Sequence, residues 1–172
     1  MLTPAFGSST APLLVIGYGN TLRQDDGVGP RVAGLVADLE LPGVEALACA
    51  QLSPEHADAV ARAHTVVFVD AQWGDTGPVR LRRLTPGKSA QVTTHAVEPR
   101  TLLALAREVY GRAPHAWMLT LPARNMDFGE ELSEVARLGI DDALRVLDRF
   151  VQLRQLRKST PRGEGSDRLV SH

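Results

Sequence analysis

The chain has 172 residues and a mass of 18.6 kDa, which is the size of a single globular domain. Its one cysteine, Cys49, excludes an internal disulfide and any zinc site built from several cysteines. The 19 Lys and Arg residues nearly balance 20 Asp and Glu residues, and the net charge of -1 argues against a nucleic-acid-binding protein, which needs a clustered basic face.

The sequence pattern contains neither a membrane span nor a secretion signal. No apolar run approaches the roughly 18–20 residues that a bilayer span needs, and residues 1–11 lack a basic stretch followed by an apolar one. We therefore expect a cytoplasmic protein that has neither a membrane nor a nucleic acid as its partner. We expect a loose lead-in over residues 1–11, one domain over 12–153, and a polar, disordered basic tail over 154–172.

The first half of the chain alternates between short apolar runs and segments with apolar residues at helical spacing. Residues 12–16 form an apolar run that ends at a glycine and predicts a buried strand, and residues 44–50 predict a weaker strand. Helices are predicted over 28–39, from the apolar spacing, and over 53–63, where a serine and a proline form a helix start.

The second half continues this alternation. A strand over 65–69 that ends at an aspartate is followed by a half-exposed edge strand over 78–84. A helix over 98–110, a strand over 116–121 and a long helix over 132–156, with a break near Gly139, complete the predicted elements. Strands that alternate with helices predict an α/β protein, here a three-layer α/β/α sandwich around a mostly parallel sheet. Ligands of such sheets gather at the carboxyl ends of the strands, so the residues that follow each strand are the functional candidates.

The turn after the first predicted strand is rich in glycine but is not a nucleotide-binding fingerprint. Gly17 and Gly19 occupy the first two glycine positions of the dinucleotide pattern, and Leu22 stands where the third glycine is required. The chain also has no Walker A loop, no GxSxG elbow and no HExxH pair. A nucleotide-binding domain is therefore an alternative that this turn disfavours.

Three polar side chains follow three different predicted strands. Asp26 lies between the glycine-rich turn and the next helix, Asp70 ends the most apolar strand, and His95 lies in a polar loop before a helix. Two carboxylates and one imidazole with open positions suit a divalent transition metal, although sequence spacing alone does not show that they converge. We interpret the neighbouring Asp25 as a residue that caps the helix or orients the turn.

The other reactive side chains fit ordinary structural roles. His56 and His64 flank a predicted helix, His115 precedes a strand, and Cys49 lies in a strand where we expect a buried, inert thiol. No serine occupies a recognisable nucleophile position. A thiol-protease pair of Cys49 and His95 would require an exposed, activated cysteine.

Four segments together carry a family resemblance. They are IGYGNTLRQDDGVG from Ile16 to Gly29, the strand end Phe68-Val-Asp70-Ala, His95, and the late segment from Pro122 to Ser133. With these segments, the chain resembles the hydrogenase maturation endopeptidases, which trim the C-terminus of the [NiFe]-hydrogenase large-subunit precursor. The resemblance runs over about residues 13–150. The late segment and the helix at 102–111 are most similar to the members that serve soluble NAD-linked hydrogenases.

The resemblance implies a twisted five-stranded sheet between helices, and it places the family's three metal-contacting positions on Asp26, Asp70 and His95. Asp26 stands where some members have Glu, and Thr94 and Ala96 flank His95 where some members have Pro and Gln. The resemblance also implies that the nickel belongs to the substrate. The three residues would then bind the precursor only after its metal has been inserted.

We therefore expect an endopeptidase that removes the C-terminal extension of the nickel-loaded precursor, works as a monomer and needs no organic cofactor. The nickel would polarise the scissile carbonyl or activate water, or either aspartate would act as a general base. Two alternatives stay open. One is a hydrolase that holds its own metal at the same residues, and the other is a non-enzymatic docking factor for a metalloprotein.

Overall fold

The computed structural model of the protein describes residues 13–74, 77–88 and 97–159. Its elements, in which η denotes a 3-10 turn, are β1 (Leu13–Tyr18), η1 (Gln24–Gly27), α1 (Val28–Asp38), β2 (Val44–Cys49), η2 (Pro54–His56), α2 (Ala57–Arg62), β3 (Thr65–Trp73), β4 (Arg80–Leu84), α3 (Pro99–Tyr110), β5 (His115–Ala123) and α4 (Glu134–Ser159). The predicted lead-in and residues 160–172 of the predicted tail lie outside the described residues.

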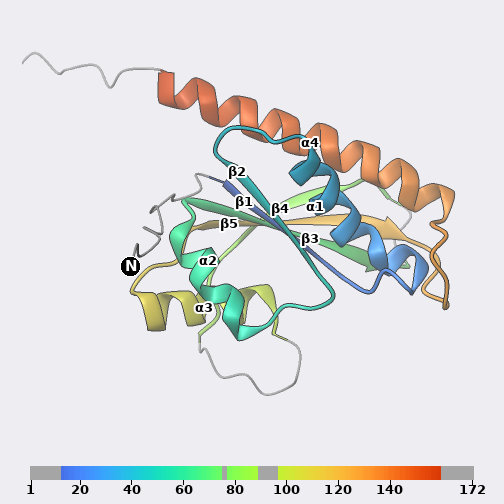
Figure 1. The fold of residues 1–172 in the computed structure, drawn as a ribbon, viewed down its shortest axis with the longest axis horizontal. Coiled ribbons are helices and arrows are strands. Elements are labelled where there is room, and N and C mark those ends of the chain that lie inside the picture. Colours follow the sequence, from blue (N-terminus) through green and yellow to red (C-terminus); the bar gives the residue numbers. More distant parts are fainter. Residues whose placement is uncertain (1–12, 75–76, 89–96, 160–172) are drawn as a thin grey trace, which may run out of the picture.

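Five strands form one sheet in the order β2–β1–β3–β5–β4 (Figure 1). The pairs β1–β2, β1–β3 and β3–β5 are parallel, and β4 runs antiparallel to β5 at the edge of the sheet. This arrangement confirms the predicted α/β class with a mostly parallel five-stranded sheet. The carboxyl ends of the four parallel strands consequently lie along the same edge.

Helices cover both faces of the sheet (Figure 1). On one face α2 and α3 pack around Phe68 and Leu102, in what we call the α2–α3 core. On the other face α1 and α4 pack around Val67 and Val32, in the α1–α4 core. Side chains of β3 alternate between the two cores, because successive side chains of a strand point to opposite faces. This double burial explains why the strand appears in the sequence as an unbroken apolar run.

The two central strands β3 and β5 are longer than predicted. The apolar run predicts a strand over 65–69, but β3 continues to Trp73 and pairs with β5 up to Ala123. The strand continues because the hydrogen bonds between two backbones do not depend on side-chain polarity. The apolar run marks only the stretch that is covered on both faces. As a consequence, Asp70 lies inside the strand and not at its end.

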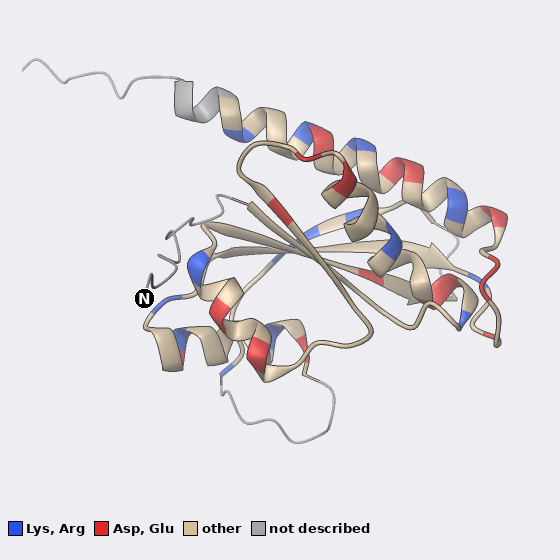
Figure 2. Cartoon of the chain, viewed as in Figure 1, with Lys and Arg blue, Asp and Glu red and all other residues tan. Residues whose placement is uncertain are grey.

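The long helix α4 is continuous, so the predicted break near Gly139 is wrong. Gly139 is buried against β5, where a Cβ atom would lie 3.1 Å from Cδ of Pro122. The glycine therefore lets the helix pack closely on the strand and does not interrupt it. Figure 2 shows acidic and basic residues interspersed along the length of α4.

The end of α4 corrects the predicted boundary of the basic tail. The helix runs to Ser159, so residues 154–159 are helical and not disordered. Arg154 lies over the ring of Phe150, at 5.9 Å from its centroid, and donates a hydrogen bond to the hydroxyl of Thr65. In the described part of the chain, no helix combines the length and the apolar character that a bilayer crossing requires.

Candidate active site

The turn between β1 and α1 is packed too closely for side chains at two positions. Gly19 has a φ of 141°, and a Cβ atom there would lie 1.9 Å from the carbonyl oxygen of Asp26. A Cβ atom on Gly17 would lie 1.8 Å from the carbonyl oxygen of Gly29. The two glycines therefore let the start of α1 fold back against the end of β1. The turn places Asp25 and Asp26 at the carboxyl edge of the sheet.

Asp25 is fully buried and accepts four hydrogen bonds from the late segment. The donors are the backbone N–H groups of Arg124 at 2.8 Å, Asn125 at 3.0 Å and Ser133 at 2.7 Å, and the Ser133 hydroxyl at 2.7 Å. Burial raises the pKa of Asp25, but the hydrogen bonds from Ser133, Arg124 and Asn125 outweigh it and bring the pKa below its ordinary value. The carboxylate is therefore held ionised without a cationic partner.

Backbone hydrogen bonds join the same two segments. Gln24 donates its N–H to the carbonyl of Gly129 at 2.8 Å, and Gly129 donates to the carbonyl of Leu22 at 2.8 Å. We call residues 22–25 and 124–133 together the loop clamp. It connects two of the segments on which the family resemblance rests, although they lie about a hundred residues apart in the sequence.

Within the described residues, neither η1 nor α1 has a side-chain hydrogen bond at its N-cap. The prediction that Asp25 caps the helix is therefore wrong, and its observed role is the alternative one, to orient the turn. The physical reason is competition. Three backbone N–H groups and a hydroxyl of the late segment surround the carboxylate, and these donors take up both of its oxygens.

Asp26 is in a different environment from its neighbour. It is only partly buried, and its Oδ2 accepts a hydrogen bond from the N–H of Asn20 at 2.8 Å. It lines an open depression of about 490 Å³ together with Arg23, Trp73 and Met126. Arg23 is itself fixed by a 3.1 Å hydrogen bond from Nε to the carbonyl of Met126. The loop clamp therefore holds the wall of the depression into which Asp26 opens.

Asp70 lies on β3, at the same edge of the sheet, and is partly buried. Its Oδ1 accepts the N–H of Ala71 at 2.8 Å, and the hydroxyl of Tyr18 donates to its carboxylate. Burial is the main cause that raises the pKa of Asp70 to about 6, and the negative charge of Asp26 raises it further. The hydrogen bonds from Tyr18 and Ala71 act in the opposite direction. We call Asp26 and Asp70 the carboxylate pair.

Tyr18 is a site residue that the sequence analysis did not identify. It ends β1, one residue beyond the pairing of Gly17 with Val69, so it comes beside Asp70 on the neighbouring strand. Burial raises its pKa above the ordinary range, and the charge of Asp70 contributes to the rise. The position could have been found from a strand alignment, because a parallel register places Tyr18 next to Asp70.

The third predicted residue, His95, lies outside the described residues. The described chain resumes at Val97, which is buried in the α2–α3 core, and at Glu98, whose charge raises the pKa of Tyr18. Within the described part of the chain, no group of three or more His, Cys, Asp and Glu side chains could hold a metal ion. The structure thus brings together Asp26 and Asp70, and His95 remains a prediction.

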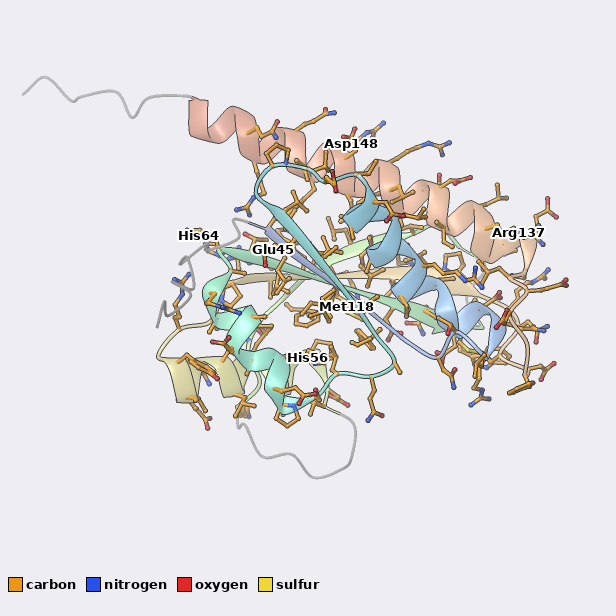
Figure 3. All side chains as sticks on the ribbon, viewed as in Figure 1. Glu45, His56, His64, Met118, Arg137 and Asp148 are labelled. Carbon is orange, nitrogen blue, oxygen red and sulfur yellow. The ribbon has the colours of Figure 1, made fainter. Side chains whose placement is uncertain are left out.

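The other histidines of the described residues and the cysteine have structural environments. His56 Nδ1 accepts the N–H of Ser53 at 3.0 Å at the start of α2, and His64 lies at the opposite end of that helix (Figure 3). His115 contacts Arg83 at the start of β5. Cys49 is partly buried beside the α2–α3 core, and burial raises the pKa of its thiol. A raised pKa disfavours the thiolate that a cysteine protease needs.

No protein-family model and no curated protein sequence matches the chain. The [NiFe] hydrogenase maturation protease HycI of Thermococcus kodakarensis matches with a TM-score of 0.62 and 22% identity, over 84% of this chain and 93% of the other. The hydrogenase 2 maturation peptidase of Thaumarchaeota archaeon SCGC_AB-539-E09 matches with a TM-score of 0.62 and 24% identity, over 82% and 98%. The hydrogenase maturating endopeptidase HybD of Escherichia coli matches with a TM-score of 0.59 and 20% identity, over 83% of this chain and 92% of the other. The chain therefore has the fold of the [NiFe] hydrogenase maturation proteases.

Proposed function

We propose that this protein is an endopeptidase that removes the C-terminal extension of a nickel-loaded [NiFe]-hydrogenase large-subunit precursor. The observation that carries the proposal is the carboxylate pair. Asp26 follows β1 in the glycine-rich turn and Asp70 lies within β3. The two carboxylates interact electrostatically and lie at the carboxyl edge of the sheet, in a fold shared with hydrogenase maturation proteases. This is the edge at which α/β proteins bind their ligands.

The nickel in this proposal belongs to the substrate. Asp26 and Asp70 contact it with carboxylate oxygens, and His95 adds an imidazole, a mixed ligand set that suits a divalent transition metal. Glu98 acts on Tyr18, which touches Asp70, and His95 is three residues from Glu98. Since consecutive Cα atoms are about 3.8 Å apart, three residues span at most about 11 Å. This short chain distance from Glu98 is what supports His95 as the third ligand in the proposal.

In the alternative to nickel contact by both carboxylates, one of them is the proton acceptor that peptide hydrolysis needs. A water molecule that attacks the scissile carbonyl must lose a proton, and a general base works best when its pKa lies close to the working pH. The pKa of about 6 favours Asp70 for this role over a carboxylate with an ordinary pKa. The nickel held by the substrate polarises the carbonyl or activates the same water.

The rim of the depression supports a protein as the substrate. Three large apolar side chains are exposed at or next to it: Leu22 at 46%, Trp73 at 61% and Phe128 at 85%. Exposed apolar side chains that gather beside a polar site are characteristic of protein–protein contact surfaces. We also propose that the enzyme acts as a monomer in the cytoplasm, which light scattering and cell fractionation would check.

The test is a cleavage assay on a large-subunit precursor, first that of a soluble NAD-linked hydrogenase, with and without inserted nickel. The expected result is a shift to the shorter chain for the nickel-loaded form alone. Asp26→Asn, Asp70→Asn and His95→Ala should each abolish this shift. A tight complex in which the nickel-loaded precursor stays intact would identify a docking factor instead. A stoichiometric metal that survives dialysis of the free protein would identify a metal-holding hydrolase.

A further inference from the structure

A second depression adjoins the first one at Trp73. It has a volume of about 440 Å³ and is lined by Arg80, Arg82, Thr120 and Gln72 in addition to Trp73. Trp73 also lines the depression that contains Asp26. The two depressions therefore share one exposed aromatic wall, and a peptide that passes the carboxylate pair can continue into the second one.

The sheet register places this second depression directly beside Asp70. Asp70 pairs with Thr120 across β3 and β5, and Thr120 pairs with Arg80 across β5 and β4. Residues that pair across strands point to the same face of the sheet, so these three side chains form one row. Tyr18, which donates to Asp70, extends the row to β1.

Arg82 lies one step further along the same face. It pairs with Met118, which packs against the α2–α3 core and lies in the middle of the molecule in Figure 3. Arg83 lies on the opposite face, because it pairs with Trp117 of the α1–α4 core. Alternation along β4 thus presents two of its three arginines to the depression and turns the third away.

The charge of the surface reverses across Trp73. The first depression contains Asp26 and Asp127 with a single arginine, Arg23, whereas the described lining of the second contains two arginines and no acidic residue. The guanidinium group binds carboxylates through two parallel hydrogen bonds. The hydroxyl of Thr120 and the amide of Gln72 provide further hydrogen-bonding groups in the same depression.

We propose that the depression at Arg80, Arg82 and Thr120 is a subsite that binds a carboxylate of the substrate's peptide chain, next to the bond that is cut. The inference rests on the proposed endopeptidase function and specifies how the substrate is held. The attraction between the two arginines and this carboxylate offsets the repulsion that the carboxylate pair exerts on an acidic peptide. It also fixes the direction in which the peptide crosses the site, because the described lining of the second depression is net positive and that of the first is net negative.

The experiment compares two charge reversals on the same strand. Arg82→Glu reverses the charge inside the subsite, and Arg83→Glu makes the same change on the other face of β4. With the nickel-loaded precursor, Arg82→Glu should raise KM by about tenfold and leave kcat nearly unchanged, as for the loss of a charge-assisted hydrogen bond. Arg83→Glu should leave both constants unchanged. Equal KM values for the two variants, with an active wild type, would overturn the subsite and leave the endopeptidase function intact.

A binding measurement covers the case in which the wild type does not cleave. The chain has two tryptophans, so the Trp117→Phe variant reports on Trp73 alone. A synthetic peptide with the sequence of the extension should change this fluorescence, and Arg82→Glu should weaken its binding by about tenfold while Arg83→Glu does not. Equal binding by both variants would overturn the subsite whatever happens to cleavage.

The carboxylate has two possible sources, an acidic side chain or the end of the substrate chain. Peptides in which Asp and Glu are replaced by Asn and Gln test the first source, and a peptide with an amidated C-terminus tests the second. If the binding of one of these peptides is no longer weakened by Arg82→Glu, the group that was changed in that peptide is the one that the subsite binds. Sensitivity that persists in a peptide with both changes would contradict carboxylate recognition.

Discussion

The loop clamp and the carboxylate pair lie at the same edge of the sheet. Each contains a buried or partly buried aspartate, and the pKa values of these two aspartates shift in opposite directions. In the clamp, the buried carboxylate of Asp25 accepts four hydrogen bonds and its pKa falls. In the pair, Asp70 has fewer hydrogen bonds and its pKa rises to about 6. A carboxylate whose oxygens are saturated by donors holds structure together, whereas one that has fewer donors remains available for chemistry.

The largest effect should come from neutralising the pair. Asp26→Asn and Asp70→Asn remove negative charge but keep shape, and cleavage of the nickel-loaded precursor should fall by about a thousandfold in each, about 4 kcal/mol of activation free energy. Thermal unfolding should show that both variants remain folded. Full activity in either variant would remove that residue from the site and would end the distinction between the pair and the clamp.

Asp25→Asn should have the largest effect on stability. The carboxamide replaces one acceptor oxygen with an NH2 group, which then faces a donor from the late segment. We expect the free energy of unfolding to fall by about 3 kcal/mol, because the donors of the late segment lose a charged acceptor and one of them is left unpaired. Asp26→Asn, on the partly buried neighbour, should change it by less than about 1 kcal/mol. Urea unfolding measures both, and equal losses would contradict the assigned roles.

The layers of this fold could be predicted from the sequence, because burial of a strand or helix face produces a characteristic pattern of apolar residues. The double-sided burial of β3 produces its apolar run. The edge strand β4 begins where Val79 and Leu81, which pack on the α1–α4 core, alternate with Arg80 and Arg82. The positions of Asp26 and Asp70 at the carboxyl edge of the sheet follow from the same patterns. Any parallel sheet brings the carboxyl ends of its strands to one edge.

The interactions that distinguish the two regions could not be predicted in this way. The partner of Asp25 is Ser133, 108 residues away, and no spacing rule connects two loops at that distance. Tyr18 was missed because a tyrosine at a strand end is ordinary until the register places it beside Asp70. Gly139 predicts a helix break by propensity, but the close packing on Pro122 prevails. Tertiary contacts decided each of these cases.

The pH dependence of stability offers a further test of the comparison. The folded pKa of Asp70, about 6, lies above its unfolded value near 3.8. Between these values the native state binds more protons than the unfolded state, so this group lowers stability as pH rises from about 4 to about 6. Asp25 behaves in the opposite way, because its lowered pKa stabilises the protein above pH 3.8 and this contribution is lost on acidification.

Asp70→Asn should therefore stabilise the inactive protein at pH 8 by about 1–2 kcal/mol, which raises Tm by roughly 2–8 °C. The gain should shrink as pH falls below 6 and should vanish near pH 3, below both pKa values, where the carboxyl group is neutral in both states. Thermal unfolding of wild type and variant at several pH values measures it. A gain that does not change with pH would show that burial of the charge is not its cause.

The smallest effect should come from Phe128, which lies in the loop clamp but is 85% exposed beside the first depression. Because its ring is so exposed against the described residues, Phe128→Ala should leave the unfolding free energy unchanged within about 0.5 kcal/mol. If the ring packs on the precursor, KM should rise by about fivefold, about 1 kcal/mol. Leu153→Ala is the matched control, because Leu153 is 62% exposed and lies beside Thr65 and His115, at the opposite edge of the sheet. An equal rise in KM for both variants would show that exposed apolar area in general, and not the surface next to the carboxylate pair, determines binding of the precursor.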